Sequence, residues 1–165
     1  SNGKVVNFFT GSLVIDGQNQ PSQSLTLKRG VARFDLNGDV AGSAAIESLT
    51  LKNVAQSGYL FAQGEVAASP ADVERNDVTA HFDTALSAST PGVLYVYEQE
   101  NAGIEVSIEA VIDGQHKVLT KTLEGNLKRN TIYTVTVRKN AIDIVVKVDI
   151  DDWEPGEDTE IIPQL

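Results

Sequence analysis

The longest stretch of alternating apolar and polar residues in this chain lies between residues 126 and 153, and it limits the possible folds more than any other feature. Two runs with a period of two residues flank Lys139-Asn140. Such a period places successive side chains on opposite faces of a β-strand, and the apolar face then needs a second layer to cover it. The stretch therefore predicts two strands joined by a turn in a β-sandwich. The apolar rows are Tyr133, Val135 and Val137, followed by Ile142, Ile144, Val146, Val148 and Ile150.

Short β-prone segments separated by turn signals make up the rest of the chain. Asp113-Gly114 lies between two alternating runs, which predicts a hairpin turn of type I′. The apolar parity changes at Arg29-Gly30, which predicts a β-bulge in one long strand. Together these features predict an all-β chain. The expected strands are residues 4–9, 12–15, 24–36, 46–54, 59–65, 78–82, 93–97, 104–112, 115–123, 131–138 and 141–150.

A helical turn is indicated only near the middle of the chain, where Ser69 could cap, Pro70 suits the first helical position and Asp72 suits the first turn. We therefore expect at most one helical turn. The surrounding residues are polar and lack apolar periodicity, so we expect a boundary between an N-terminal module, residues 1–70, and a C-terminal module, residues 71–165. The pattern leaves open whether these are two sandwiches or one continuous pair of sheets.

Composition excludes several classes of protein. The chain has no cysteine, so neither disulfides nor thiolate metal sites can support the fold. The apolar runs are too short for a membrane-spanning helix, and nothing resembles a signal peptide. Because the chain opens at Ser1 and contains no methionine, we expect a mature or trimmed product.

Acidic side chains are concentrated near the C-terminus. The formal net charge is −10, and residues 149–160 contain acidic residues but no Lys or Arg. An acidic surface repels phosphate backbones, so we expect no nucleic-acid partner and interpret the acidic run as a solvated tail. Its Asp149-x-Asp151-Asp152 cluster has the carboxylates that calcium prefers, but the loop pattern of a calcium site is missing.

The search for catalytic and metal-binding motifs gives no candidate site. His81 and His116 lie far apart without zinc-type spacing, and no third ligand is identifiable for His81 and Asp83, which share a strand face. The chain has no nucleophile elbow, phosphate loop or dinucleotide fingerprint. A carboxylate pair for glycoside hydrolysis stays open, because its separation depends on the fold and nothing singles out two of the 23 acids. We expect no enzymatic activity, no cofactor and no metal.

Three segments carry the motifs of a known family. Residues 127–137 read Leu-Lys-Arg-Asn-Thr-Ile-Tyr-Thr-Val-Thr-Val and precede a strand that ends in Asp152-Trp153-Glu154. Residues 27–36 contain L-x-R-x-V-A-R, and residues 93–98 end in Y-x-x-E. In this order the segments resemble the fimbrillins of Bacteroidales, the subunits of type V pili. The motif residues are Arg29, Ala32, Tyr95, Glu98, Arg129, Asn130, Tyr133 and Trp153.

The resemblance implies two transthyretin-like antiparallel β-sandwich modules. Because family members are usually larger, it also implies that this chain is a compact or N-terminally trimmed version. It implies an exported subunit of a fimbria at the cell surface, associated with the outer membrane, whose partners are other pilus subunits and a host protein or glycan. Assembly would proceed by β-strand addition, in which the C-terminal extension of the next subunit fills a groove.

The C-terminal extension, residues 154–165, contains the candidate donor strand for this assembly. Strand addition needs an open sheet edge and a detachable segment that alternates. Residues 159–165 alternate, and Trp153-Glu154-Pro155-Gly156 precedes them as a turn, although Pro163 makes pairing beyond Ile162 one-sided. The alternative is that they pack on their own domain or fray at the terminus. The candidate donor residues are Thr159, Ile161, Ile162 and Leu165.

The motif residues have a functional and a structural interpretation. Arg129, Asn130 and Tyr133 could form a partner-facing patch, but Tyr133 lies in the apolar row, where a tyrosine packs its ring and bonds its hydroxyl at the rim. Trp153 could stack on a sugar, but a lone tryptophan at the end of a core strand more often closes the sandwich. The structural interpretation is favoured for both.

Three functions follow from these observations. The leading expectation is a structural or adhesive subunit of a cell-surface pilus that polymerises by β-strand addition. The alternative is a surface β-sandwich that binds a glycan or host protein, as a tip adhesin or a surface lipoprotein. The third possibility is a carbohydrate hydrolase, and only the excess of acidic residues supports it.

Overall fold

The computed structural model describes residues 8–12, 25 and 27–147. The expectations for residues 148–165, which include Trp153 and the candidate donor strand, lie outside this part of the chain. The described residues form β-strands, loops and one 3-10 turn, η1 (Asp39–Ala41). The strands are β1 (Phe9–Thr10), β2 (Lys28–Arg29), β3 (Val31–Asn37), β4 (Ala44–Ala55), β5 (Arg75–Leu86), β6 (Thr90–Tyr97), β7 (Glu105–Ile112), β8 (Gln115–Thr122), β9 (Thr131–Val137) and β10 (Ile142–Lys147).

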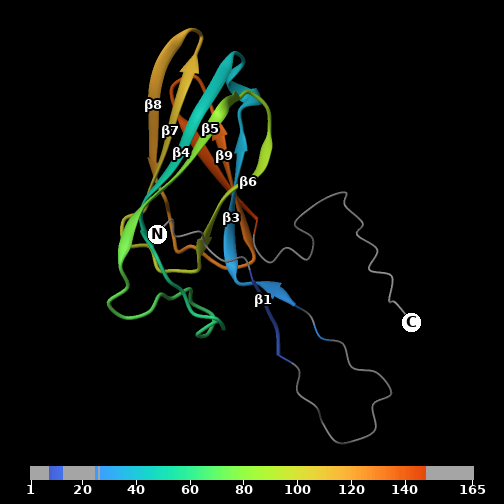
Figure 1. Cartoon of the computed structure of the whole chain (residues 1–165), viewed down its shortest axis with the longest axis vertical. Helices are drawn as coiled ribbons and strands as arrows, with labels where there is room; N and C mark the ends of the chain where they lie inside the picture. Colours follow the sequence, from blue (N-terminus) through green and yellow to red (C-terminus); the bar gives the residue numbers. More distant parts are fainter. Residues whose placement is uncertain (1–7, 13–24, 26, 148–165) are drawn as a thin grey trace, which may run out of the picture.

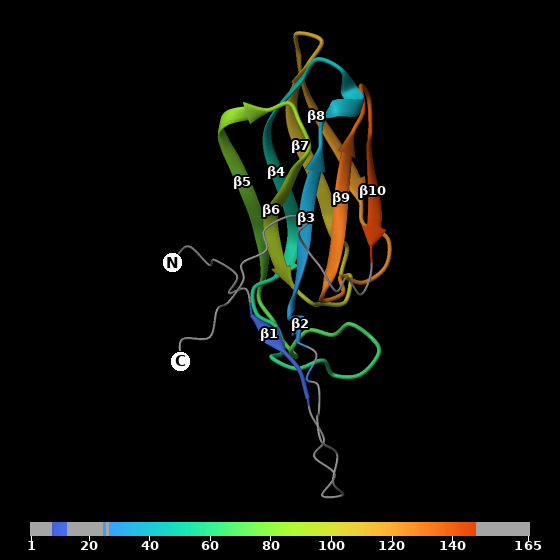
Figure 2. The same ribbon diagram turned by 90° about the vertical axis from the view of Figure 1, so that its right-hand side faces the viewer.

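Two four-stranded sheets face each other and form a sandwich (Figure 1). Figure 2 shows the sheet with strand order β10-β9-β3-β6 in front and the sheet with order β5-β4-β7-β8 behind it. At the sides of the sandwich, β5 lies beside β6 and β8 lies beside β10. A short ribbon of β1 and β2 extends from one end.

The core lies between the sheets and is built from the alternating apolar rows. Phe34 of β3 and Tyr133 of β9 are side by side in the parallel pairing of these strands, and their rings stack with centroids 5.1 Å apart. Burial of such rows is the main favourable contribution to folding. The buried rows include Ala32, Phe34 and Leu36 of β3, Ile46, Leu49 and Leu51 of β4, Val106, Ile108 and Ala110 of β7, and Tyr133, Val135 and Val137 of β9.

The all-β prediction is confirmed, and so are the two predicted hairpin turns. Asp113 and Gly114 have φ values of 51° and 77° and connect Ile112 to Gln115, as a type I′ turn requires. The hairpin of β9 and β10 turns at residues 139–140, where the Arg138 N–H donates to the Ala141 carbonyl across 2.9 Å.

The predicted helical turn at residues 69–72 is wrong, because the single 3-10 turn of the described residues lies at Asp39–Ala41. Ser69 does not cap a helix; its hydroxyl donates to Glu100 and accepts from Arg75. Asp72 has a φ of 56°, which a right-handed helix excludes. The strand predicted at residues 59–65 is also wrong. The carbonyls of Tyr59 and Leu60 accept hydrogen bonds from the side chain of Arg129 and not from a neighbouring strand.

The parity change at Arg29-Gly30 marks a change of strand partner instead of a bulge within one ladder. β2 pairs with β1, whereas β3 pairs with β6 and β9. The Gly30 N–H donates to the Phe8 carbonyl across 2.8 Å, and a Cβ at Gly30 would lie 2.0 Å from Cε2 of the Phe8 ring. Glycine is therefore required for the close approach of Phe8, and the chain bends at this point.

The expected boundary near residue 70 lies in the loop between β4 and β5 and does not separate two cores. β3 and β4 come from the first range, yet they pair with β5, β6, β7 and β9 from the second. Their inward side chains belong to one buried cluster. The described residues thus form one continuous pair of sheets. The pairing of β3 with β9 is parallel, so the sandwich is not wholly antiparallel.

Candidate functional site

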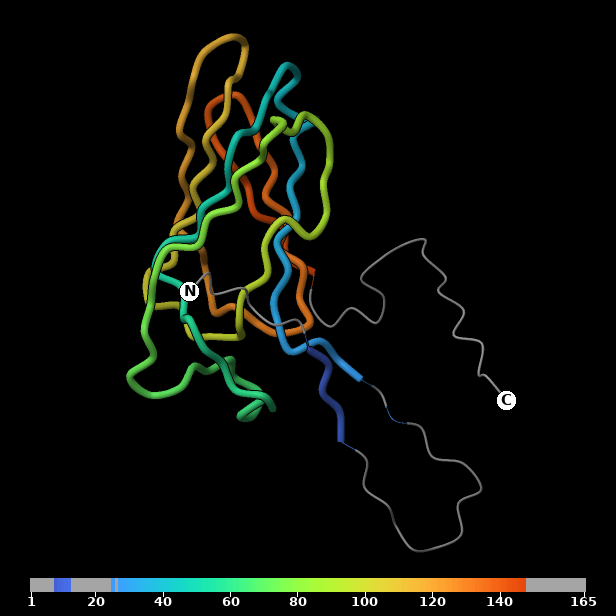
Figure 3. The backbone as a smooth tube through the Cα atoms, viewed as in Figure 1, coloured from blue at the N-terminus to red at the C-terminus, as the bar shows by residue number. Residues whose placement is uncertain are grey.

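The long connection between β4 and β5, residues 56–74, crosses the end of the sandwich from which the β1–β2 ribbon extends (Figure 3). We call it the 56–74 loop. Its two ends are held together, because the Gln56 N–H donates to the Glu74 carbonyl across 2.9 Å. Connections of this length without secondary structure are uncommon in compact domains and are usually functional or disordered. The loop is therefore the first place to look for a binding site.

Arg129 fixes the first part of the loop. Its Nη2 donates to the Tyr59 carbonyl across 2.9 Å and its Nη1 donates to the Leu60 carbonyl across 3.0 Å. The Nε donates to Glu98 Oε1 at 3.0 Å, and the Arg129 N–H donates to Glu98 Oε2 at 3.2 Å. The two side chains are only 11% and 10% exposed. The planar guanidinium thus joins a buried carboxylate on one side to the loop backbone on the other.

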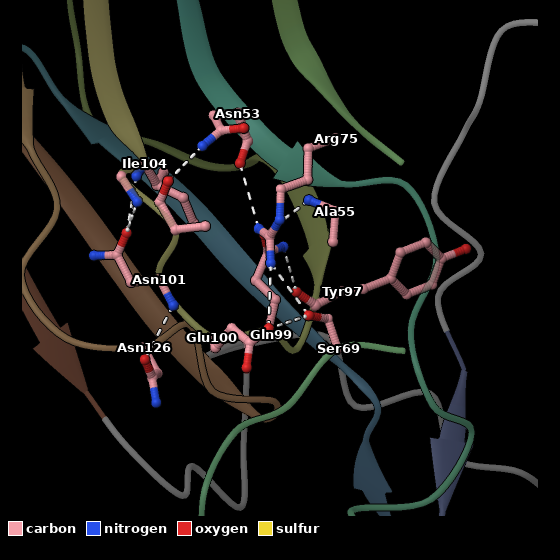
Figure 4. Close-up of polar contacts among 12 residues, drawn as sticks. Asn53, Ala55, Ser69, Arg75, Tyr97, Gln99, Glu100, Asn101, Ile104 and Asn126 are labelled. Carbon is pink, nitrogen blue, oxygen red and sulfur yellow. Dashed lines mark hydrogen bonds and ion pairs between the residues drawn. The ribbon is translucent and has the colours of Figure 1, made fainter. Parts of the chain in front are cut away.

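Arg75 and Gln99 fix the last part of the loop (Figure 4). The Gln99 Oε1 accepts from the Ala55 N–H at 2.8 Å and from Arg75 Nη1 at 3.0 Å, while its Nε2 donates to the Tyr97 carbonyl at 2.9 Å. Arg75 Nη2 also donates to the Ser69 hydroxyl at 3.1 Å. Gln99 is completely buried, so these bonds satisfy an amide that would otherwise destabilise the fold.

Asn101 joins the connections on either side of β7 and β8 at the same end. Its Oδ1 accepts from the N–H groups of Gly103 and Ile104 at 3.0 and 2.8 Å. Its Nδ2 donates to the Leu123 carbonyl, and its N–H donates to Asn126 Oδ1. Local bonds of this kind hold a loop in one conformation without regular secondary structure. This end of the sandwich is therefore held together by side-chain bonds from several elements.

The loop presents exposed apolar side chains to solvent. Leu60, Phe61 and Val66 are 58%, 55% and 70% exposed, and we call these three residues the apolar tip. The ribbon at the same end exposes Phe9 and Leu27, and the Arg29 guanidinium lies 4.6 Å from the centroid of the Phe9 ring. Grouped exposed apolar side chains are typical of interaction sites. This end of the molecule is the candidate functional site.

The structure brings several of the fimbrillin-like motif residues together at the start of β9. Asn130 has a φ of 51°; its N–H donates to the Val31 carbonyl at 3.0 Å and its Oδ1 accepts from the Arg29 N–H at 3.4 Å. The Tyr133 hydroxyl accepts from the Lys128 N–H at 3.0 Å and donates to the Asn126 carbonyl at 3.2 Å. Burial of Tyr133 raises the pKa of its phenol above the usual value.

The remaining motif residues lie on other parts of the sandwich. Ala32 is fully buried in the core between Val96 and Thr131. Tyr95 packs with Tyr97 against a small apolar cluster around Val31 and Ile132, on the opposite face of the sheet from the core. Trp153 and the candidate donor residues lie outside the described part, so their positions stay predictions. The donor residues are Thr159, Ile161, Ile162 and Leu165.

The histidines do not form a metal site within the described residues. His81 is exposed on β5, whereas His116 on β8 lies with its Nε2 3.2 Å from Glu47 Oε2. Across residues 8–12 and 27–147, no group of three His, Cys, Asp or Glu side chains could hold a metal ion. The acidic cluster that begins at Asp149 lies outside this range. The described residues also contain no helix with the length and apolar character needed to cross a membrane.

Sequence reasoning missed the apolar tip and two of its anchors, Arg75 and Gln99. Tyr59, Leu60 and Phe61 are β-prone, which led to the prediction of a strand. Nothing near Gln99 or Arg75 in sequence signals that these side chains hold a distant loop. The best available signal is the Gln56-Ser57-Gly58 turn before the tip, because the residues that follow it have no clear partner strand.

Comparison with known proteins gives a family match and several similar solved structures, among them two from Bacteroides. The model of the family described as bacterial Ig-like domain, Big_5, matches residues 64–151. A protein of Bacteroides ovatus, provisionally assigned to cell adhesion, has 13% sequence identity and a TM-score of 0.44; the match covers 77% of this chain and 45% of that protein. A second such protein, from Bacteroides fragilis, has 15% identity and a TM-score of 0.41, with 74% and 46% covered.

This chain spans less than half the length of either solved protein. No curated protein matches it significantly. The family match extends over more than half of the chain and includes β5 to β10 of the sandwich. The chain therefore belongs to the Big_5 family of bacterial Ig-like domains.

Proposed function

We propose that this chain is a structural and adhesive module of a bacterial cell-surface pilus, without enzymatic activity, and that the apolar tip contacts its partner. The observation that carries the proposal is the exposure of Leu60 and Phe61 on a backbone that Arg129 fixes. Apolar groups on a fixed backbone lose little conformational freedom on binding, so more of their burial contributes to affinity. Membership of the Ig-like family is compatible with a role in binding or in building a fibre.

The charged groups near the tip support adhesion better than catalysis. Glu98 and Arg129 bond to each other and to backbone groups, and the Arg75 guanidinium bonds to Gln99 and Ser69. These groups bond to one another and to the loop, so they hold the loop in place. Their positions suit a surface that must keep its shape against a partner.

A protein partner fits the apolar tip better than a glycan. Leu60 and Val66 carry no groups that could bond sugar hydroxyls, whereas their exposed area would be buried in an apolar pocket of another protein. We therefore favour a host protein or another pilus subunit. The glycan-binding alternative depends on Trp153, whose position is a prediction.

The tip can be tested with matched surface variants. Leu60→Ser and Phe61→Ser should each weaken the adhesion of protein-coated beads to cultured epithelial cells and immobilised matrix proteins, and the double variant should abolish it. Val118→Ser is the control, because Val118 is similarly exposed, at 56%, but lies on β8. All four variants should keep the wild-type melting temperature within a few degrees. Unchanged adhesion by the double variant would refute the role of the tip.

We further propose that the module joins other subunits by β-strand addition. The proposal rests on the fimbrillin-like motifs, and the edge strands of both sheets support it, since β5, β6, β8 and β10 each pair with a described strand on one side only. Deletion of residues 159–165 should abolish polymers in cells and leave the thermal unfolding of the sandwich unchanged. Normal fibres from this variant would exclude these residues as the donor strand.

A further inference from the structure

The edge strand β10 exposes two adjacent apolar side chains. Among the described strands β10 pairs only with β9, and Val145 and Val146 are 55% and 45% exposed. Natural edge strands usually carry prolines, bulges or central charges that prevent pairing with another chain. β10 has β-branched residues at its centre instead, so it is a suitable template for another strand.

The sequence of β10 is self-complementary about Val145. If a second copy of β10 lies antiparallel with Val145 opposite Val145, then Asp143 of each copy lies opposite Lys147 of the other, and Ile144 lies opposite Val146. Directly opposite residues point to the same face of a sheet, and opposite charges in such pairs are stabilising. Lys147 has no ion-pair partner among the described residues, so the pairing would supply one.

The backbone of β10 is oriented for this pairing. The Arg138 N–H bonds to the Ala141 carbonyl, and hydrogen-bonded and non-bonded pairs alternate along an antiparallel ladder. Asp143, Val145 and Lys147 therefore direct their backbone groups toward β9, while Ile144 and Val146 direct theirs away from it. In the paired copies, each Ile144 faces a Val146 and the two can exchange both N–H···O bonds.

Two of the other edge strands, β6 and β8, are less suited to self-pairing. The equivalent antiparallel pairing of β8 about Leu119 would place Lys117 of one copy opposite Lys121 of the other, which is unfavourable. β6 contains Pro91 near its start, and proline has no N–H to donate. β10 is therefore better suited to self-pairing than β6 or β8.

We propose that two copies of this chain associate through their β10 edges, antiparallel about Val145, so that the two β10-β9-β3-β6 sheets become one continuous sheet across a twofold axis. The contact is isologous, which closes a dimer and does not propagate a fibre. It is therefore separate from the proposed strand addition and from the proposed adhesion through the apolar tip.

A single introduced cysteine tests the register. The chain has no native cysteine, so Val145→Cys carries one thiol. The argument above places residue 145 of both copies in a non-hydrogen-bonded pair, where the Cα atoms are about 4.5 Å apart, a distance that a disulfide can span. Val145→Cys should form a disulfide-linked dimer in a glutathione redox buffer. Val118→Cys, equally exposed on β8, should stay largely monomeric. Equal yields from the two variants would overturn the proposal.

A charge exchange tests the ion pairs without a cysteine. In sedimentation equilibrium the wild-type protein should show a monomer–dimer equilibrium, and Lys147→Glu should weaken the dimer by roughly tenfold at low salt, because two exposed ion pairs become repulsive. The double variant Asp143→Lys/Lys147→Glu should recover the affinity. A wild-type protein that stays monomeric at every concentration, or a Lys147→Glu variant that dimerises as tightly as wild type, would refute the self-pairing.

Discussion

The guanidinium of Arg129 lies between the carboxylate of Glu98, at 3.0 Å, and the backbone of the 56–74 loop, to which it donates two further hydrogen bonds. Both side chains are nearly buried. The Arg129–Glu98 ion pair therefore joins the start of β9 to the residues that follow β6. The same guanidinium also holds the 56–74 loop, which precedes β5. This contact ties the backbone of Tyr59 and Leu60, at the start of the apolar tip, to the sandwich.

Removal of Arg129 should destabilise the whole domain. Arg129→Ala leaves Glu98 buried without its partner, which should lower the free energy of unfolding by about 3–5 kcal/mol, measured by urea denaturation. The control is Lys52→Ala, because the Lys52–Glu105 pair is as short, at 2.6 Å, but its side chains are 45% and 37% exposed. That variant should keep nearly the wild-type stability, because an exposed ion pair contributes little. Equal losses would show that the Arg129 pair is not a structural anchor.

Arg129→Lys should separate the charge from the loop contacts. Lysine can keep the ion pair with Glu98 but cannot present a planar fork to two carbonyls. We expect chymotrypsin to cleave after Phe61 several times faster than in the wild-type protein, while the tryptic and urea stability of the sheets falls less than in Arg129→Ala. Wild-type cleavage rates would mean that the loop is held by its other anchors alone.

Tyr133→Phe should destabilise the domain and change its alkaline stability. The variant leaves the Lys128 N–H and the Asn126 carbonyl without their partner, at a cost of about 1–3 kcal/mol. Burial raises the pKa of Tyr133 above 10.0, so the folded state favours the protonated phenol. That contribution is complete below pH 10 and is lost as the pH rises through the folded-state pKa. Wild-type urea midpoints should fall more steeply above pH 10 than those of Tyr133→Phe; parallel curves would exclude Tyr133 as the cause.

Gly30→Ala should displace Phe8. The added Cβ would overlap the Phe8 ring, and we expect a loss of about 1–3 kcal/mol in thermal or urea unfolding. The double variant Phe8→Ala/Gly30→Ala should be no less stable than Phe8→Ala alone, because the clash is then absent. If the two losses simply add, the glycine is required for another reason.

Two surface carboxylates should make the domain sensitive to acid. A hydrogen bond from the Ser43 hydroxyl and the proximity of Lys139 lower the pKa of Asp113, and Arg138 lowers the pKa of Asp143. A depressed pKa contributes stability above the ordinary value of 3.8, and this is lost as the pH falls through the folded-state pKa. Urea midpoints should therefore fall as the pH drops below the ordinary value of 3.8. Asp113→Asn/Asp143→Asn should flatten that fall, and an unchanged slope would contradict this assignment.

Local patterns were sufficient to predict most of the strands and the tight turns. The alternation in residues 131–137 and 142–147 and the Asp113-Gly114 turn each depend on a few neighbouring residues, and the structure has them as predicted. The prediction of a helical turn at residues 69–72 was wrong because the Ser69 hydroxyl bonds to Arg75 and Glu100. The local sequence does not indicate these contacts. Hydrogen bonds between separate elements therefore override the local helix signals at this position.

The arrangement of the strands and the candidate site depended on distant pairings. No local signal indicates that Ala32 pairs with Thr131, and this pairing is what makes one sandwich from the two predicted modules. The apolar tip was predicted as a strand because Arg129, which occupies its carbonyls, lies far away in the sequence. Motif resemblance selected Glu98 and Arg129, but it did not indicate what they hold.

The placement of β3 between β6 and β9 has a consequence for the way the chain acquires its fold. Both neighbours of β3 are synthesised after it, and the parallel pairing with β9 must wait until nearly all the described strands exist. Contacts between distant parts of a chain form slowly, and uncovered apolar strands are prone to aggregate meanwhile. We therefore expect the Ala32, Phe34 and Leu36 row to lack its β9 neighbour until late in translation, so that a holding chaperone would favour folding of the nascent chain.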